Sequence, residues 1–466
     1  MKLRSIIQFF TRLCEQHSLL SFIHAHKAHA TALSQAIILE DSSDGDQQPA
    51  PRLWPRSITS LEEPQFRWLL GSNAAFFLAI QGQILTRTYL AWDLTGEEMS
   101  LAYVNIAFAV PMLIFSIFGG AFSDRTERRF LALFGQGFVV LSEAIVLVLL
   151  LLGTLEFWHI LAAGALSGAV IPFSMPARTA IVFNVVGPNR LGNATALSGG
   201  VMNVCRVVGP MIMGFAIDFF DVTGAYVVAV SLHVVAFFCL FGVKRCYSDQ
   251  KNRKNLGQEI SSGFRYVFER RALMMCILFG LLPMFLAMPF QNLLVVFADE
   301  VWNVGERGLG IMMSAAGLGG VAGSVWMARR GEITNRTKLM IGTTLLFGIC
   351  LGAFAITPLF AFALVPLVVA NAFASASQTL NNTAAQLLVE DEYRGRVSAI
   401  MLMTFGLMPL GVVPMAMMAS AIGVKLAIVI ASVTLVLVVI LFYSVSPSLR
   451  ELDKHVAKAL RQHQPS

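Results

Sequence analysis

Residues 119–129 read GGAFSDRTERR and separate two apolar stretches that are each about twenty residues long. Five charged side chains, from Asp124 to Arg129, lie in this one short turn. A charged turn cannot lie in hydrocarbon, so this one must lie at a membrane surface. The stretch therefore predicts an integral membrane protein built from spanning helices.

The composition of the whole chain supports this class. Of its 466 residues, 56% are hydrophobic and 13% are charged, whereas soluble domains carry roughly 25% charged residues. The net charge of +6 does not indicate nucleic-acid binding, because the cations lie in the gaps between apolar runs and form no basic face. The six cysteines contain no CxxC pair and are expected to act as apolar fillers.

Apolar runs and short polar gaps alternate from Arg67 onward. Each run is about long enough to cross ~30 Å of hydrocarbon at ~1.5 Å per residue. The pattern predicts an all-α protein with twelve transmembrane helices in two six-helix, pseudo-symmetric halves. The predicted spans are residues 67–90, 99–122, 130–152, 157–177, 194–217, 223–243, 272–297, 308–327, 338–357, 359–380, 397–420 and 423–445.

Five parts of the chain follow from these spans. They are a polar and disordered extension (1–65), two six-helix halves (66–243 and 272–446), a central loop (244–271) and a tail (447–466). The extension has no secretory h-region. Its His24, His26 and His29 could bind a metal, but no acidic or thiol partner is placed nearby, so the expectation is no metal site and no cofactor. Helical spacing of Phe264 and Phe268 predicts an amphipathic helix in the central loop.

The distribution of Lys and Arg predicts the orientation. Most of the 34 cations fall on one side of the predicted spans, and the opposite turns collect Asp and Glu. The exceptions are Arg87, Arg206, Arg307 and Lys425. By the positive-inside rule, both termini are cytoplasmic. A bacterial inner membrane is the expected location, with the lipid bilayer as a partner and a monomer as the expected state.

Two motifs resemble the major facilitator superfamily over roughly residues 66–446. DRTERR follows the second span, and EDEYRGRVSA (390–399) leads into GLMPLG (406–411). The second motif is similar to the enterobactin-exporter-like, or transmembrane secretion effector, branch. Glu127 stands where the superfamily pattern has glycine, and the fourth-span arginine motif is not recognisable, since Arg178 falls at the predicted cytosolic end. The resemblance implies an exporter of small molecules driven by a proton gradient.

The charged turns predict a cytoplasmic gate that closes through ion pairs between the two halves. The alternative is a solvated turn that only sets topology, where exposed pairs contribute roughly 0–1 kcal/mol. The candidate gate residues are Asp124, Arg125, Arg128, Arg129, Arg178, Glu390, Asp391, Glu392, Arg394 and Arg396.

Glu143 and Arg206 lie near the middle of predicted spans, where a charge costs roughly 2.5–3.5 kcal/mol. Both should face the protein interior or each other. Glu143 is a candidate proton carrier, because burial favours the neutral form of a carboxylate. The alternative is a structural partner of Arg206 or of another polar group. His233, also within a span, is expected to be a satisfied core histidine.

Polar side chains on the predicted spans are candidate substrate contacts. The resemblance places the first, fourth, seventh and tenth helices around a cavity, and the alternative role is helix–helix hydrogen bonding. The candidates are Asn73, Gln81, Gln83, Arg87, Asn105, Gln291, Asn292, Asn371 and Gln378. Helix bends are predicted at Gly209, Pro210, Pro409, Gly411 and Pro414.

The sequence as a whole predicts a secondary active transporter that exports a siderophore-like or drug-like molecule in exchange for protons. A carrier of lysophospholipid or of an imported metabolite is the alternative. A membrane-embedded enzyme or assembly factor is disfavoured because no HExxH or paired aspartates occur at membrane depth. No Walker A motif is present, so ATP is not expected to drive transport.

Overall fold

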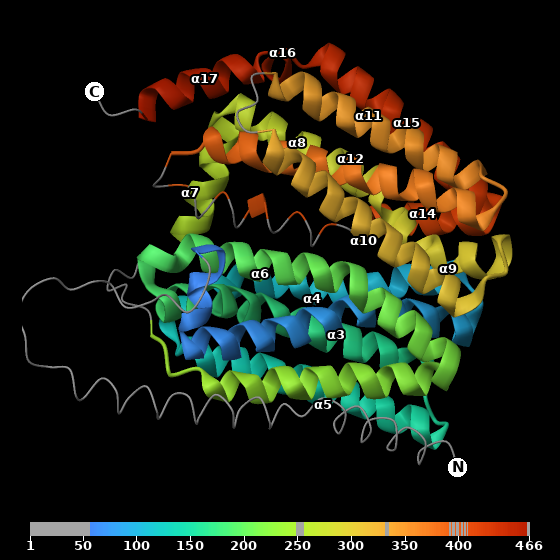
Figure 1. Cartoon of the computed structure of the whole chain (residues 1–466). Helices are drawn as coiled ribbons and strands as arrows, with labels where there is room; N and C mark the ends of the chain where they lie inside the picture. The colour runs from blue at the N-terminus through green and yellow to red at the C-terminus, as the bar shows by residue number, and fades with distance from the viewer. Residues whose placement is uncertain are drawn as a thin grey trace, which may run out of the picture. The chain divides into compact units, whose positions relative to one another are not determined.

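A computed structural model shows a helical protein (Figure 1). It describes residues 56–247, 256–330, 335–390 and 409–463, together with Tyr393, Val397, Ile400, Met401, Thr404 and Leu407. Every regular element in these residues is a helix. From Ser57 onward the chain forms one compact unit.

The described part of the first half contains four long helices and two short 3-10 helices. They are η1 (Arg56–Glu62), α3 (Pro64–Thr95), α4 (Glu98–Arg125), α5 (Arg128–Leu152), α6 (Phe157–Cys239) and η2 (Leu240–Gly242). The α6 helix is 83 residues long and has non-helical backbone angles at Gly187 (φ 70°) and Asp221 (φ 60°). Glycine adopts a positive φ without steric cost, so Gly187 suits the first of these breaks. Two candidate membrane spans, Phe157–Gly187 and Arg190–Gly242, therefore follow one another here, and the Asp221 break lies within the second.

The second half begins with a helix on the central loop. Its elements are α7 (Leu256–Glu269), α8 (Arg271–Leu286), η3 (Met288–Leu293), α9 (Leu294–Val296), η4 (Phe297–Val301), α10 (Gly305–Arg329), α11 (Arg336–Ile356), α12 (Phe360–Leu387), α14 (Pro409–Ile422), α15 (Val424–Val445), α16 (Pro447–Arg450) and α17 (Leu452–His463).

The described residues contain nearly as many candidate spans as the predicted twelve, but they do not establish that number. Ten helices among the described residues are long and apolar enough to cross a membrane. One of them, Arg190–Gly242, is 53 residues long and contains the Asp221 break, and Leu410–Ile422 is a shorter apolar helix. Part of the predicted eleventh span, 397–420, lies outside the described residues. Twelve spans therefore remain a prediction.

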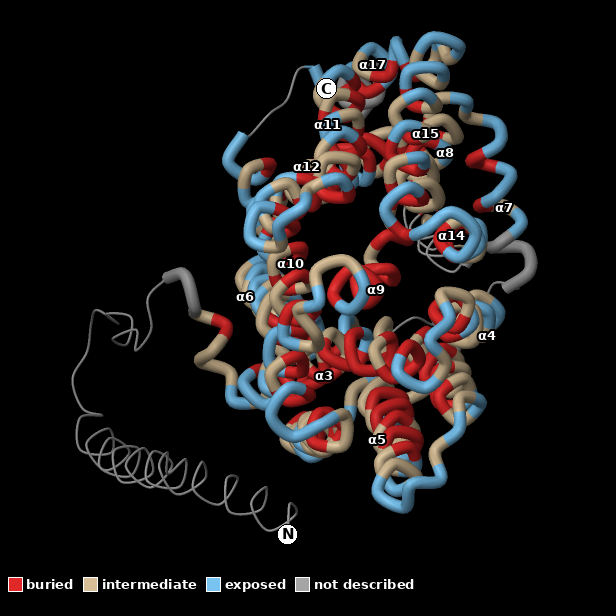
Figure 2. The backbone as a smooth tube through the Cα atoms, turned by 90° about the vertical axis from the view of Figure 1, so that its right-hand side faces the viewer, coloured by how far each residue is buried: buried red, intermediate tan, exposed pale blue. Residues whose placement is uncertain are grey.

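The exterior of the helices is apolar, which suits lipid. Leu152, Phe219 and Val445 are each more than 60% exposed although they lie on spanning segments. Buried residues instead gather around α3 and α9 (Figure 2). Large exposed apolar surfaces are rare on soluble monomers, so the distribution of burial agrees with the membrane class predicted from composition.

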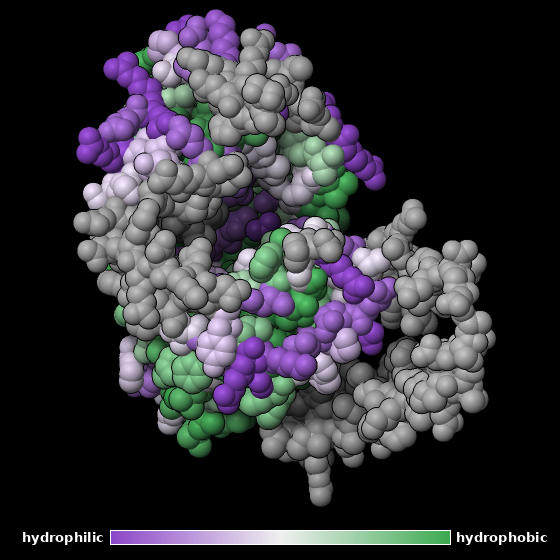
Figure 3. Space-filling view, turned by 90° about the vertical axis from the view of Figure 1, so that its left-hand side faces the viewer, coloured by the Kyte–Doolittle hydropathy of each residue, from purple (hydrophilic) through white to green (hydrophobic). Residues whose placement is uncertain are grey.

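The two ends of the helices differ in charge. We call the end that carries Arg128, Lys244 and Arg271 the basic end, and the end that carries Asp93, Asp299 and Glu306 the acidic end. A view onto the basic end shows a hollow with hydrophilic residues at its floor (Figure 3).

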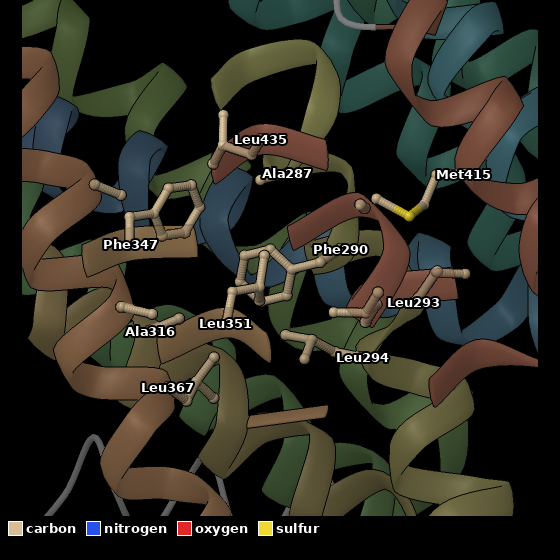
Figure 4. Close-up of a cluster of buried hydrophobic side chains, with 14 of the residues drawn as sticks. Ala287, Phe290, Leu293, Leu294, Ala316, Phe347, Leu351, Leu367, Met415 and Leu435 are labelled. Carbon is tan, nitrogen blue, oxygen red and sulfur yellow. The ribbon is translucent and has the colours of Figure 1, made fainter. Parts of the chain in front are cut away.

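The seventh predicted span, 272–297, is not one regular helix. Pro283 lies inside α8, which ends at Leu286, and a 3-10 helix, an α-turn and a π-helix follow. Proline removes a backbone donor and clashes with the preceding turn. The irregular backbone is held in a buried apolar cluster formed by Ala287, Phe290, Leu293, Leu294, Ala316, Phe347, Leu351, Leu367, Met415 and Leu435 (Figure 4).

Both predicted polar ends of the chain contain ordered helix. In the extension, the buried Ser60 of η1 donates from its backbone N–H to Asn193 Oδ1 (3.0 Å). In the tail, Asp453 on α17 accepts from the backbone N–H of Thr337 at the start of α11 (3.3 Å). Burial of Leu452 and Val456 adds an apolar contact. The folded part therefore extends beyond the predicted boundaries at residues 66 and 446.

Candidate functional site

The two halves are joined at the acidic end by side-chain hydrogen bonds. Tyr89 Oη on α3 donates to Glu306 on α10 (2.5 Å), and Trp92 Nε1 donates to Asp299 on η4 (2.9 Å). These contacts surround a cavity of about 350 Å³ that Asp93 also lines. We call this set of contacts the acidic-end seam. Hydrogen bonds to carboxylates are stronger than neutral ones, so the seam favours a closed acidic end.

An amide pair extends the contact between the halves. Asn105 Nδ2 on α4 donates to Asn292 Oδ1 on η3 (2.9 Å). Gln291 Nε2 lies 3.5 Å from Asn371 Oδ1 on α12. The irregular η3 segment thus presents two neighbouring amides, one to the first half and one to α12. Four of the predicted cavity residues are brought together here, and each makes a helix–helix hydrogen bond.

A second group of predicted residues lies inside the first half. Glu143 on α5 is fully buried and forms an ion pair with Arg87 on α3. Arg87 Nη2 also donates to Ser167 Oγ on α6 (2.9 Å). The second carboxylate oxygen of Glu143 and Arg87 Nε have no hydrogen-bond partner among the described residues. The predicted cavity residue Arg87 is therefore the partner of the predicted proton carrier.

Arg206 is not the partner of Glu143. Its side chain is exposed on α6, with Nη1 3.6 Å from where a Cβ on Gly320 of α10 would lie. The sequence left open whether Glu143 pairs with Arg206 or with another polar group, and the structure selects the other group. The reason is helix rotation, since Glu143 faces α3 within its own half.

Arg178 does not lie at the end of its helix, although the predicted span 157–177 placed it there. It is 3% exposed and donates to Ser72 Oγ (3.0 Å), Asn73 Oδ1 (2.8 Å) and Gln136 Oε1 (2.9 Å). The α6 helix continues to Gly187 before its angles change, so Arg178 is well inside the helix. It is thus a buried residue of the first half, and its membership of the cytoplasmic gate stays a prediction.

Neutral groups complete the surroundings of Arg178. Its guanidinium lies 4.3 Å from the ring centroid of Phe76, which permits a cation–π contact. Gln136 Nε2 also donates to the backbone oxygen of the buried His233 (2.9 Å). The predicted cavity residue Asn73 is thereby committed to binding an arginine. Sequence reasoning missed Gln136, although its seven-residue spacing from Glu143 places both on one face of α5.

The predicted gate is only partly within the described side chains. Arg128 Nη1 donates to Asn184 Oδ1 (2.5 Å), and Arg129 Nη2 donates to the backbone oxygen of Phe241 (3.3 Å). Both contacts are within the first half. The side chains of Asp124 and Arg125, and the residues Asp391, Glu392, Arg394 and Arg396, lie outside the described part.

Glu390 contacts the central loop. It forms an ion pair with Arg270, and its backbone N–H donates to Tyr266 Oη (3.0 Å). Tyr266 stacks on Tyr393 with ring centroids 4.1 Å apart. The end of α7 is therefore fastened to the beginning of the motif 390–399, a contact that the sequence did not predict.

The remaining predicted residues have simpler surroundings. Gln83 is buried, and its Nε2 has no hydrogen-bond partner among the described residues. Gln81 is half-buried, and Gln378 is exposed. A Cβ on Gly209 would lie 3.0 Å from Gln81 Cβ, and one on Gly411 would lie 2.4 Å from Phe285 O. These glycines permit close helix packing. The helix α6 stays helical through Gly209 and Pro210, α14 begins at Pro409, and Pro414 lies inside α14.

Comparisons with known proteins agree with this architecture. The staphyloferrin A transporter of Staphylococcus aureus is 24% identical over 80% of this chain and 95% of its own length. Macrolide efflux protein A of Streptococcus pyogenes is 21% identical over 77% of this chain and 89% of its own. The enterobactin exporter of Shigella boydii is 23% identical over 69% of this chain and 76% of its own.

Solved structures share the fold. The nucleoside transporter NupG has a TM-score of 0.65 at 11% identity and covers 82% of this chain and 98% of its own. A bacterial homologue of the lysosomal transporter Spinster, in an inward-facing and unoccupied conformation, has a TM-score of 0.64 at 14% identity over 86% of this chain and 99% of its own. The transmembrane secretion effector family matches residues 56–466, so the chain belongs to this family of major facilitator membrane transporters.

Proposed function

We propose that this protein exports a small organic molecule across the bacterial inner membrane by alternating access, in exchange for protons. The observation that carries the proposal is the acidic-end seam, with a hollow at the opposite end (Figure 3). Such a pairing of a closed end with an open end is what one state of a carrier requires. Export begins when substrate enters the open end.

The substrate class in this proposal is a siderophore-like or drug-like molecule. The relatives named above handle staphyloferrin A, macrolides and enterobactin. In the present chain, four candidate substrate contacts form a cluster of amides at η3, where Asn105 bonds Asn292 across the halves and Gln291 lies 3.5 Å from Asn371. Amides donate and accept hydrogen bonds without adding charge, which suits a bulky molecule rich in oxygen and nitrogen.

Glu143 is proposed as the proton carrier. One of its carboxylate oxygens is paired with Arg87 and the other has no partner among the described residues. Protonation would weaken the attraction to Arg87 and leave the guanidinium to Ser167. A change of this kind can favour one of two helix arrangements, which couples the proton to the movement of the halves.

The basic end is proposed to face the cytoplasm, with both termini there and the protein acting as a monomer. The positive-inside rule supports this orientation. Arg128 and Arg129 would then belong to the cytoplasmic gate together with Glu390 and the acidic residues 391 and 392, which lie outside the described part of the chain.

Flux in proteoliposomes tests the proposal. The purified protein is reconstituted with a pH-sensitive dye inside the vesicles, and staphyloferrin A, enterobactin and a macrolide are added in turn. We expect at least one of them to move protons in a protein-dependent manner. Transport of a compound from this set without proton movement would contradict the coupling. No transport of any of them, with correctly folded protein, would contradict the substrate class.

A further inference from the structure

An aromatic groove lies on the outer face of the first half, apart from the contacts described above. Phe130, Phe134 and Phe138 line it from α5, and Phe237 and Phe241 line it from α6 and η2. Its volume is about 440 Å³. Phe130, Phe134 and Phe241 are each more than half exposed, so these rings are accessible from the exterior of the helices.

The shape of the groove follows from residue spacing. Phe130, Phe134 and Phe138 stand four residues apart, which places them on one face of α5, and successive ring centroids are 5.9 and 4.6 Å apart. Gly137 leaves the floor open between this row and Phe237. From residue 130 to residue 141 the groove runs about 16 Å at ~1.5 Å per residue, close to half of the ~30 Å hydrocarbon thickness.

Among the described residues, cations stand at the end of the groove that Phe130 and Phe241 form. Arg129 places its guanidinium 5.5 Å from the ring centroid of Phe241, and its Nε is buried without a hydrogen-bond partner in the described part of the chain. Arg128 Nε is also buried without a hydrogen-bond partner among the described residues. Lys244, three residues after Phe241 in the sequence, is exposed. The carboxylate in this turn whose contacts are described, Glu127, accepts from the backbone N–H of Cys246 (3.3 Å). These two Nε atoms are closed to solvent, so a phosphate would bind through the other N–H groups of the two half-buried guanidiniums, which are strong donors to phosphate oxygens.

We propose that this groove binds one acyl chain of an anionic phospholipid, with the phosphate at Arg129 and Arg128. The apolar length matches a chain that reaches from the head-group level to the middle of the bilayer. The charge at the basic end matches an anionic head group and disfavours a lipid without net charge. A lipid fits better than a protein helix, because a helix is about 10 Å wide with its side chains, whereas a single Cβ on Gly137 would already lie 3.5 Å from Phe237 Cε2 across the groove.

Native mass spectrometry of the full-length protein in a nonionic detergent tests the proposal. Dioleoyl phosphatidylglycerol and dioleoyl phosphatidylcholine are offered at equal concentration. We expect the first bound molecule of phosphatidylglycerol to be retained at least tenfold better than phosphatidylcholine. Arg129→Gln should reduce this retention at least tenfold, and Arg129→Lys should retain most of it. Equal retention of both lipids by the unaltered protein would overturn the proposal.

The chain offers a matched control at the acidic end. The guanidinium carbon of Arg307 lies 4.7 Å from the ring centroid of Phe215. Arg307→Gln therefore removes a cation that also contacts an aromatic ring but lies at the end opposite to the groove's cations. It should leave lipid retention unchanged. A loss equal to that of Arg129→Gln would mean that any surface cation retains the lipid, and would overturn the site.

A second pair of variants tests the acyl chain. A Cβ on Gly137 would lie 3.5 Å from Phe237 Cε2, an ordinary contact, so Gly137→Ala should fold and retain the lipid. Gly137→Phe fills the groove and should lower retention at least tenfold while thermal melting stays near that of Gly137→Ala. Unchanged retention in Gly137→Phe, or equal binding of soluble glycerol phosphate, would mean a head-group site without an acyl groove and would overturn the proposal.

Discussion

Two buried arginines in the first half have opposite electrostatic surroundings. Arg87 is paired with the carboxylate of Glu143, whereas Arg178 is held by a hydroxyl, two amide oxygens and an aromatic ring. Both are less than 8% exposed. The difference teaches that burial alone does not identify a proton site. A proton needs a group that changes charge, and Glu143 is the only carboxylate among the described residues that bond or pair with these two arginines.

The largest difference between the two arginine sites is expected when Glu143 is neutralised. Glu143→Gln leaves Arg87 as an unpaired buried charge, which costs about 3–5 kcal/mol. We expect proton-coupled transport to fall at least a hundredfold and the melting temperature to drop. Flux in proteoliposomes and thermal unfolding in detergent measure the two effects.

The double variant Arg87→Met with Glu143→Met separates folding from coupling. Replacing both members of a buried pair by apolar groups is often neutral for stability, so folding should recover while coupling stays lost. Recovery of coupled transport in this double variant would show that the pair is structural and would refute the role of Glu143.

A smaller effect is expected at Arg178. Arg178→Met leaves Ser72, Asn73 and Gln136 without their donor, at about 1–3 kcal/mol for unsatisfied buried groups. The melting temperature should fall, while the number of protons moved per substrate stays the same. Reversal-potential measurements give that number, and a changed number would place Arg178 in the coupling machinery beside Glu143.

The acidic-end seam extends the comparison to partly buried contacts. Tyr89→Phe removes the hydrogen bond to Glu306, and a bond to a charged group is worth about 1.5–3 kcal/mol. Accessibility of the closed end should rise about tenfold. The measurement is labelling of Leu309→Cys, a cavity-lining position, by an impermeant maleimide in a background without native cysteines. Tyr103→Phe, at an exposed tyrosine on α4, is the control, and the same labelling rate in both variants would contradict a role of the seam.

The smallest effect belongs to an exposed pair. Lys454 and Glu451 lie 3.1 Å apart, and both side chains are more than half exposed. Lys454→Gln should change stability by less than about 0.5 kcal/mol, because solvent screens such pairs. Thermal unfolding checks this. A large loss of stability in Lys454→Gln would mean that the size of an ion pair's contribution does not follow its burial, which would contradict the comparison of buried with exposed charges.

Some site residues could be predicted from sequence and others could not. Glu143 and Arg87 stand out because charges are rare within apolar runs. Their pairing could not be predicted, since they are 56 residues apart and meet because α3 and α5 both pack against α6. Arg178 was misplaced because polar residues near the end of an apolar run suggest a helix end, whereas α6 continues to Gly187. The seam joins residues more than 200 positions apart.

The sequence by itself determined that the chain is a helical membrane protein with one basic and one acidic end. Hydropathy and charge act locally along each run, because every spanning segment must satisfy the bilayer on its own. The tertiary structure decided which carboxylate faces which arginine, where α8 breaks into irregular backbone and which end is closed. Those outcomes depend on how each helix is rotated against its neighbours, and contacts between distant segments set that rotation.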